Sequence, residues 1–146
     1  MAKAWQHVVT EEELTFWIRW LDTIGDERIR KYDRDEWNVA GDVDVFGLSA
    51  IGRIEQARIL RAFELNLSGR ATLDKHAPGS YGLKHDAESW ISLTEGRPYY
   101  VSELQCRTCM RILGYHRTYG RHGRYNVSML SYHRWRRKID ELRHAR

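Results

Sequence analysis

Residues 129–142 read MLSYHRWRRKIDEL, and apolar side chains recur in this stretch at every third or fourth position. That spacing gathers them on one side of an α-helix, which predicts an amphipathic final helix with a buried seam. The seam consists of Met129, Tyr132, Trp135, Ile139 and Leu142. The outward positions carry the cations Arg134, Arg137, Lys138 and Arg143. This helix is therefore expected to supply both core and a basic surface.

Helical signals also occur in the N-terminal half. Thr10 and Glu13 form a capping-box pattern that starts a helix ending at Gly25, with Leu14, Trp17, Ile18 and Leu21 as its apolar stripe. A weaker pattern predicts a short amphipathic helix within 26–37, and 38–48 suits a loop or one short strand. Ser49 then caps a core helix that ends at Ser68 and Gly69. Its inward residues are Ile51, Ile54, Ile59, Leu60 and Phe63.

Two helices follow in the second half of the chain. The first is predicted over 80–96, with Ser80 as N-cap and an apolar face of Tyr81, Leu83, Ala87, Trp90 and Ile91. The second is predicted over 102–114, with Ser102 as N-cap and Leu104, Cys109, Ile112 and Leu113 facing the core. Joined across 95–101, they form a corner related to a helix-turn-helix, with a longer connector than usual. Arg107 and Arg111 would lie on an exposed face of the second helix, so a DNA-reading helix is a hypothesis.

The fold class follows from these patterns together with length and composition. The chain has 146 residues, 42% of them hydrophobic, which suffices for the core of one domain over residues 1–146. We expect a mostly α, single compact domain of about five helices, with an irregular basic loop over 115–127. No apolar run suits a membrane span or signal peptide, and the two cysteines fit a reducing compartment, so we expect a cytoplasmic protein. We expect no cofactor.

Charge divides the chain into two unequal parts. The acidic front, residues 1–106, has a balance of −5, whereas the basic C-terminal third, residues 107–146, has a balance of +9. Tyrosines, histidines and a tryptophan alternate with arginines in the basic third. Guanidinium groups bind phosphates and flat rings stack on bases, so this mixture is typical of nucleic-acid surfaces. The alternatives are a solvated basic face or a contact with the acidic front of a second copy.

Two metal-dependent interpretations compete with simple binding. Cys106, Cys109, His116 and His122 offer ligand types that zinc accepts, but the cysteine pair lies inside a predicted helix that uses Cys109 for its core. His122, Asn126 and His133 suggest a small His-Asn-His nuclease, although no acidic residue accompanies the first histidine. No phosphate-binding loop or serine nucleophile elbow is present, and a cysteine nucleophile paired with a histidine stays open. A non-enzymatic role without a metal is therefore the leading prediction.

The stretch 72–115 resembles a family of small uncharacterised proteins encoded by phages and other mobile elements. The resemblance rests on a Ser-Tyr-Gly-x-Lys-His-x-x-Glu core, a following Tyr-x-Ser and a later Gly-Tyr. These positions are Ser80, Tyr81, Gly82, Lys84, His85, Glu88, Tyr100, Ser102, Gly114 and Tyr115. The resemblance implies an accessory protein that acts on replication, transcription or host defence, and it makes an anti-defence inhibitor of the anti-CRISPR type an alternative.

The core of this motif also has a purely physical interpretation. Ser80 caps the helix, Lys84 and Glu88 form an i,i+4 ion pair, and Tyr81 and His85 lie one turn apart on the same face. These features are commonly structural: a cap, a surface ion pair and a half-buried aromatic ring. The functional alternative places Lys84 and His85 beside the basic third as phosphate or partner contacts.

The sequence thus predicts a non-enzymatic nucleic-acid-binding accessory protein. Its partner is nucleic acid or a nucleic-acid-bound complex of the host, with no membrane involved and with the oligomeric state open. An inhibitor that docks on a host protein or ribonucleoprotein is the first alternative, and a metal-dependent nuclease is the second. The candidate contacts are Lys84, His85, Arg107, Arg111, Arg121, Arg124, Arg134, Arg137 and Lys138.

Overall fold

The computed structural model describes residues 9–20, 50–118 and 123–145. Within these ranges the chain forms five helices, and backbone pairing outside them amounts to two isolated antiparallel bridges, Gly69–Val127 and Arg117–Tyr125. The prediction of a mostly α, single compact helical domain is confirmed. The helices are α1 (Glu11–Trp20), α3 (Ala50–Asn66), α4 (Ser80–Glu95), α5 (Glu103–Ile112) and α6 (Met129–His144).

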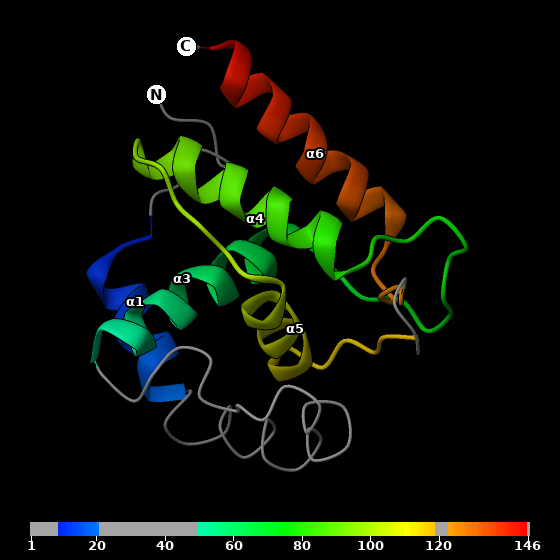
Figure 1. The fold of residues 1–146 in the computed structure, drawn as a ribbon, viewed down its shortest axis with the longest axis horizontal. Helices are drawn as coiled ribbons and strands as arrows, with labels where there is room; N and C mark the ends of the chain where they lie inside the picture. The colour runs from blue at the N-terminus through cyan, green and yellow to red at the C-terminus, as the bar shows by residue number, and fades with distance from the viewer. Residues whose placement is uncertain (1–8, 21–49, 119–122, 146) are drawn as a thin grey trace.

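Helix α3 is the centre of the fold and packs against each of the other four helices. Helices α4 and α6 lie side by side and run in the same direction, while α1 and α5 pack on α3 away from α6 (Figure 1). Trp135 of α6 is completely buried and meets Phe63 of α3 edge to face, with ring centroids 5.9 Å apart. The other predicted seam residues of α6 are also buried, apart from Met129, which packs partly buried against the core.

The helix starts follow local hydrogen-bonding signals in three cases. The Thr10 hydroxyl accepts from the Glu13 amide of α1 at 3.2 Å. Ser102 and Gln105 form a complete capping box at α5, and Ser128 caps α6. Each cap satisfies backbone amides that the helix itself leaves without a partner.

The prediction that Ser80 caps α4 is wrong. Gly79 is the N-cap residue, in an extended conformation and without a side-chain cap. Ser80 is the first helical residue, and its hydroxyl donates to Glu103 Oε2 at 3.3 Å and accepts from Arg107 Nε at 3.1 Å. A tertiary contact between α4 and α5 therefore replaces the expected local cap.

The apolar faces of α4 and α5 are shifted from the predicted ones. Leu83, Ala87, Trp90 and Ile91 of α4 are buried as expected, but Tyr81 is 64% exposed because its position turns away from α3. In α5, Cys109 and Ile112 are buried together with Cys106 and Met110. Leu104 and Leu113 are only half-buried.

Several predictions concern residues that the structure does not describe. The continuation of α1 to Gly25, the weak helix within 26–37, the loop or strand at 38–48 and the Ser49 cap lie outside the described residues. So does the Ile51 side chain. In the described part of α1, no side chain is completely buried. Among the described helices, none combines the length and the apolar character that crossing a membrane requires.

Residues 115–118 and 123–127, the described parts of the predicted basic loop, are irregular. They pair with each other at Arg117–Tyr125 and with the beginning of the α3–α4 connection at Gly69–Val127. The Tyr125 amide also donates to the Pro78 carbonyl at 3.0 Å, which holds the loop against the start of α4.

Candidate nucleic-acid interface

Three cations of α6 are close together on one face of the helix. Arg134 and Arg137 are exposed and Lys138 is half-buried. None of the three forms an ion pair with a residue in the described ranges, whereas Asp140 of the same helix pairs with Arg143 at 3.4 Å. We call Arg134, Arg137 and Lys138 the α6 cation group.

Two members of the α6 cation group, Arg134 and Lys138, repel each other. Partial burial lowers the pKa of Lys138, and the positive charge of Arg134 one turn earlier lowers it further. Like charges at i,i+4 destabilise a helix unless an opposite charge is nearby. A phosphate placed over this face would supply that charge.

Two other arginines of α6 face α4 instead. Arg136 Nε lies 3.9 Å from Asp86 Oδ1, and Arg143 Nη2 donates to Ser89 Oγ at 2.8 Å. Both arginine side chains nevertheless remain more than half exposed. They therefore border the junction of the two helices while leaving part of each guanidinium accessible.

Asp86 anchors this junction from the α4 side. The Tyr132 hydroxyl donates to Asp86 Oδ2 at 2.8 Å. Burial raises the pKa of the Asp86 carboxyl, and this effect outweighs the lowering by the Tyr132 hydrogen bond and by Arg136. Burial also raises the pKa of Tyr132, so its hydroxyl stays protonated as the donor.

Lys84 lies inside the structure and not on a basic surface. Lys84 is only 8% exposed, and its Nζ lies 3.4 Å from Glu88 Oε1. The predicted ion pair between Lys84 and Glu88 therefore exists, but it is largely buried. His85 Nδ1 approaches the same Glu88 oxygen at 2.9 Å, and the other Glu88 oxygen accepts from the Val101 amide at 3.2 Å. Glu88 thus joins α4 to the segment that precedes α5.

Two of the remaining candidate cations, Arg107 and Arg124, lie near the start of α4. Arg107 pairs with Glu103 at 3.2 Å, Arg124 Nη1 donates to the Ala77 carbonyl at 2.8 Å, and Arg111 is half-buried on α5. Arg121 lies outside the described residues. The eight predicted contacts that the structure describes do not share one accessible surface, because Lys84 is buried. Every residue of α5 is buried or half-buried, so this helix lacks the free face of a DNA-reading helix.

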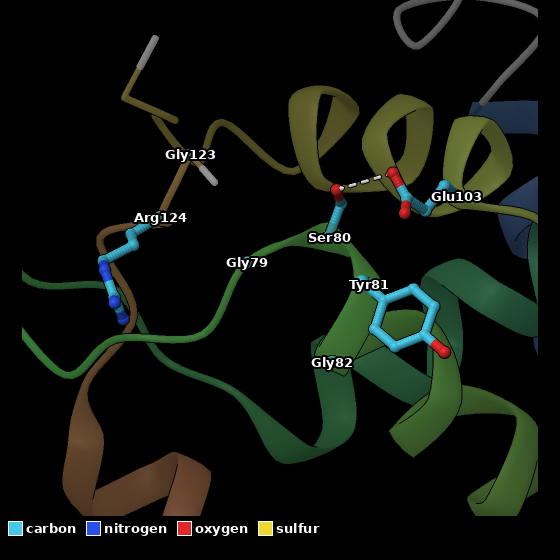
Figure 2. A pocket seen from close by; sticks show the side chains of 7 residues that line it. All are labelled: Gly79, Ser80, Tyr81, Gly82, Glu103, Gly123 and Arg124. Carbon is cyan, nitrogen blue, oxygen red and sulfur yellow. Dashed lines mark hydrogen bonds between the residues drawn. The ribbon is translucent and has the colours of Figure 1, made fainter. Parts of the chain in front are cut away.

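A pocket of about 220 Å³ opens at the start of α4. Figure 2 shows Arg124 on one side of Gly79 and Tyr81 on the other, and it shows the hydrogen bond between Ser80 and Glu103. The pocket thus presents a cation, a carboxylate and an aromatic ring together. Its lining consists of Gly79, Ser80, Tyr81, Gly82, Glu103, Gly123 and Arg124.

The cysteines belong to the core. Cys106 and Cys109 are completely buried, and burial raises the pKa of both thiols. A protonated, inaccessible thiol is a poor metal ligand and a poor nucleophile. His116 is exposed, and no group of three metal-ligating side chains occurs among the residues that the structure describes. Of the proposed zinc set, His122 lies outside those residues.

Asn126 of the proposed nuclease motif has a structural role. Its side-chain oxygen accepts from the His116 amide at 2.7 Å and its side-chain nitrogen donates to the Arg70 carbonyl at 3.0 Å. One end of the amide therefore joins the two described parts of the basic loop, and the other end ties the loop to the α3–α4 connection. His133 is exposed on the first turns of α6.

Two features of the surface were missed in the sequence. Arg136 was not named, and Arg143 was placed on the outward side of the helix without being named as a contact; their spacing of seven residues puts them on the same flank of α6 and could have singled them out. Tyr100 is 73% exposed in the connector between α4 and α5, and no local signal distinguishes it from the half-buried Tyr99. Comparison with protein-family models, curated proteins and solved structures finds no match to this chain.

Proposed function

We propose that this protein binds nucleic acid through the α6 cation group, as a non-enzymatic accessory protein of a phage or another mobile element. The observation that carries the proposal is the presence of three neighbouring cations on one helix face without an ion pair to any described residue. The genomic setting rests on the sequence resemblance alone.

Electrostatics favours a phosphate backbone as the ligand of this face. Each cation that neutralises a phosphate releases condensed counterions, which is the main driving force of sequence-independent binding. The repulsion between Arg134 and Lys138 is also relieved when an anion lies between them. Three of the groups considered for metal binding or catalysis, Cys106, Cys109 and Asn126, serve packing and loop structure, which favours a binding role.

The test measures affinity for a short DNA duplex at several salt concentrations. Replacing Arg134, Arg137 and Lys138 together with Ala should reduce the slope of log affinity against log salt by about 2 to 3, since each phosphate contact contributes about 0.9 to that slope. The control replaces three exposed cations outside α6, namely Arg19, Lys75 and Arg97, with Ala. The control loses the same net charge and should keep the slope.

Two results would overturn the proposal. One is the absence of binding at low salt, in which case an inhibitor that docks on a host protein complex becomes the better hypothesis. The other is an equal loss of affinity in both triple variants, because net charge would then explain binding and the α6 face would not.

A further inference from the structure

An exposed aromatic stripe lies on α4 and on the connector that follows it. Tyr81 is 64% exposed and Tyr100 is 73% exposed. His85, one turn after Tyr81, is half exposed and meets the Tyr81 ring edge to face, with centroids 4.5 Å apart. We call Tyr81, His85 and Tyr100 the aromatic stripe.

The rings of this stripe are held in place from below. The Lys84 ammonium lies 5.8 Å from the Tyr81 ring centroid and 5.0 Å from that of Tyr100. Lys84 is in turn fixed by Glu88, which also contacts His85 and the Val101 amide. One buried cation thus orients two exposed rings, which lowers the entropy lost when a ligand stacks on them.

Exposed cations lie near the aromatic stripe. On the α6 side, Arg136 contacts Asp86 and Arg143 contacts Ser89, and Ser89 is one turn beyond His85 on α4. At the start of α4, Tyr81 shares the pocket with Arg124, which is exposed (Figure 2). Flat rings near accessible guanidinium groups match the two needs of a nucleic-acid strand, base stacking and phosphate neutralisation.

We propose that the aromatic stripe binds single-stranded nucleic acid, with bases stacked on Tyr81 and Tyr100 and phosphates beside Arg136 and Arg143. This inference rests on the proposed function and names its preferred ligand. Bases within a duplex are already stacked and cannot reach the rings, so the stripe adds affinity for a single strand only. The α6 cation group, by contrast, attracts phosphates of either form.

The same rings also shield Lys84 from water, and that role alone would explain their position. The two roles differ in what a variant changes. If the rings only cover Lys84, replacing them alters stability and leaves the preference for single strands unchanged. If bases stack on them, single-strand affinity falls while duplex affinity does not.

The experiment uses the full chain with three fluorescent probes: oligo-dT and oligo-rU of about 12 nucleotides, within the site sizes of single-strand binders, and a DNA duplex of equal length. Tyr81→Leu and Tyr100→Leu should each weaken binding of the single strands by at least about fivefold, the lower limit for loss of one stacking contact. Duplex affinity should be unchanged. The two oligonucleotides distinguish DNA from RNA as the preferred strand.

Three controls make the result specific. Tyr81→Phe and Tyr100→Phe keep the rings and should keep single-strand affinity. Phe16→Leu removes a 60% exposed ring from α1, on another part of the molecule, and should also have no effect. Photocrosslinking of a 5-iodouracil strand, followed by mass spectrometry, should label Tyr81 or Tyr100.

The possible failures are distinguishable. If all three probes bind with the expected salt dependence but the Leu variants match the parent protein, the aromatic stripe is not a stacking site and the proposed function stands. If no probe binds, the proposed function fails and this inference fails with it. Equal weakening for duplex and single strands also contradicts base stacking.

Discussion

At the scale of single residues, the important groups are charged side chains buried by neighbouring helices. Asp86 and Lys84 both belong to α4; Lys84 was expected to form a surface ion pair or a partner contact, and Asp86 was not singled out in the sequence. Lys84 is neutralised by Glu88, whereas Asp86 depends on Tyr132 and a long contact to Arg136. The raised pKa of Asp86 shows that burial is only partly offset there.

This balance makes stability depend on the charge of Asp86. Because its pKa in the folded protein is above the ordinary 3.8, the folded state binds the proton more tightly than the unfolded chain. The stabilisation of the folded state by this proton is complete below pH 3.8. It is lost as the pH rises through the pKa that Asp86 has in the folded protein. Asp86→Asn should therefore raise the free energy of unfolding at pH 7, relative to the parent protein, with a gain that disappears below pH 3.8. Urea unfolding across this range measures it.

A second substitution checks the hydrogen bond separately from the charge. Asp86→Ala leaves the Tyr132 hydroxyl without its acceptor and should cost about 1 to 3 kcal/mol at pH 7, the usual penalty for an unsatisfied buried group. If Asp86→Asn destabilises the protein as much as Asp86→Ala at neutral pH, the ion pair with Arg136 matters more than burial.

At the scale of elements, the start of a helix depends either on residues nearby in the sequence or on contacts with another helix. The α5 start is local: the Ser102 hydroxyl accepts from the Gln105 amide at 3.0 Å, and the Gln105 side chain accepts from the Ser102 amide at 3.0 Å. The α4 start is not local, since Gly79 supplies the boundary and Ser80 bonds across to α5. The same residue type, serine before an apolar run, thus has two different roles.

The capping box predicts a measurable stability difference at α5. Ser102→Ala should lower the free energy of unfolding by about 1 kcal/mol, the typical cost of losing an N-cap side chain. Ser102→Asp retains an acceptor at the helix N-terminus and should be close to neutral. Urea unfolding of the two variants tests this, and equal destabilisation by both would show that the hydroxyl matters for another reason.

At the scale of the whole molecule, the basic loop is held against the helices by close backbone packing. A Cβ at Gly79 would lie 2.7 Å from the Gly123 carbonyl oxygen, although the two glycines are far apart in the sequence. The Tyr125 amide bonds to Pro78 beside this point. Such an approach requires glycine, and it places Arg124 next to the start of α4.

Two glycine substitutions on neighbouring positions test this packing. Gly79→Ala should destabilise the fold by about 1 to 3 kcal/mol, because backbone must move to admit the methyl group. Gly82→Ala, inside α4, meets only the Tyr132 hydroxyl at 3.9 Å and should be neutral or stabilising by up to about 1 kcal/mol, since alanine favours a helix. Thermal unfolding compares them, and a neutral Gly79→Ala would contradict the close packing.

Local patterns in the sequence were sufficient for much of the fold. The apolar period of 129–142, the capping box at Ser102 and the stop at Gly96 depend on residues within a few positions of each other, so the helices that they define could be predicted. The outward position of Arg134 and Arg137 follows from the same period. The buried seam and the free cations of α6 are two consequences of one helical repeat.

Tertiary structure alone decided which side chains near α4 are accessible. The same helical spacing that placed Tyr81 with the core leaves it exposed, and the paired Lys84 is buried beneath it. Neither outcome follows from neighbours in sequence, because each depends on where α5, α6 and the connector pack against α4. Burial is a property of surfaces brought together by distant segments, whereas helix formation is a property of adjacent residues.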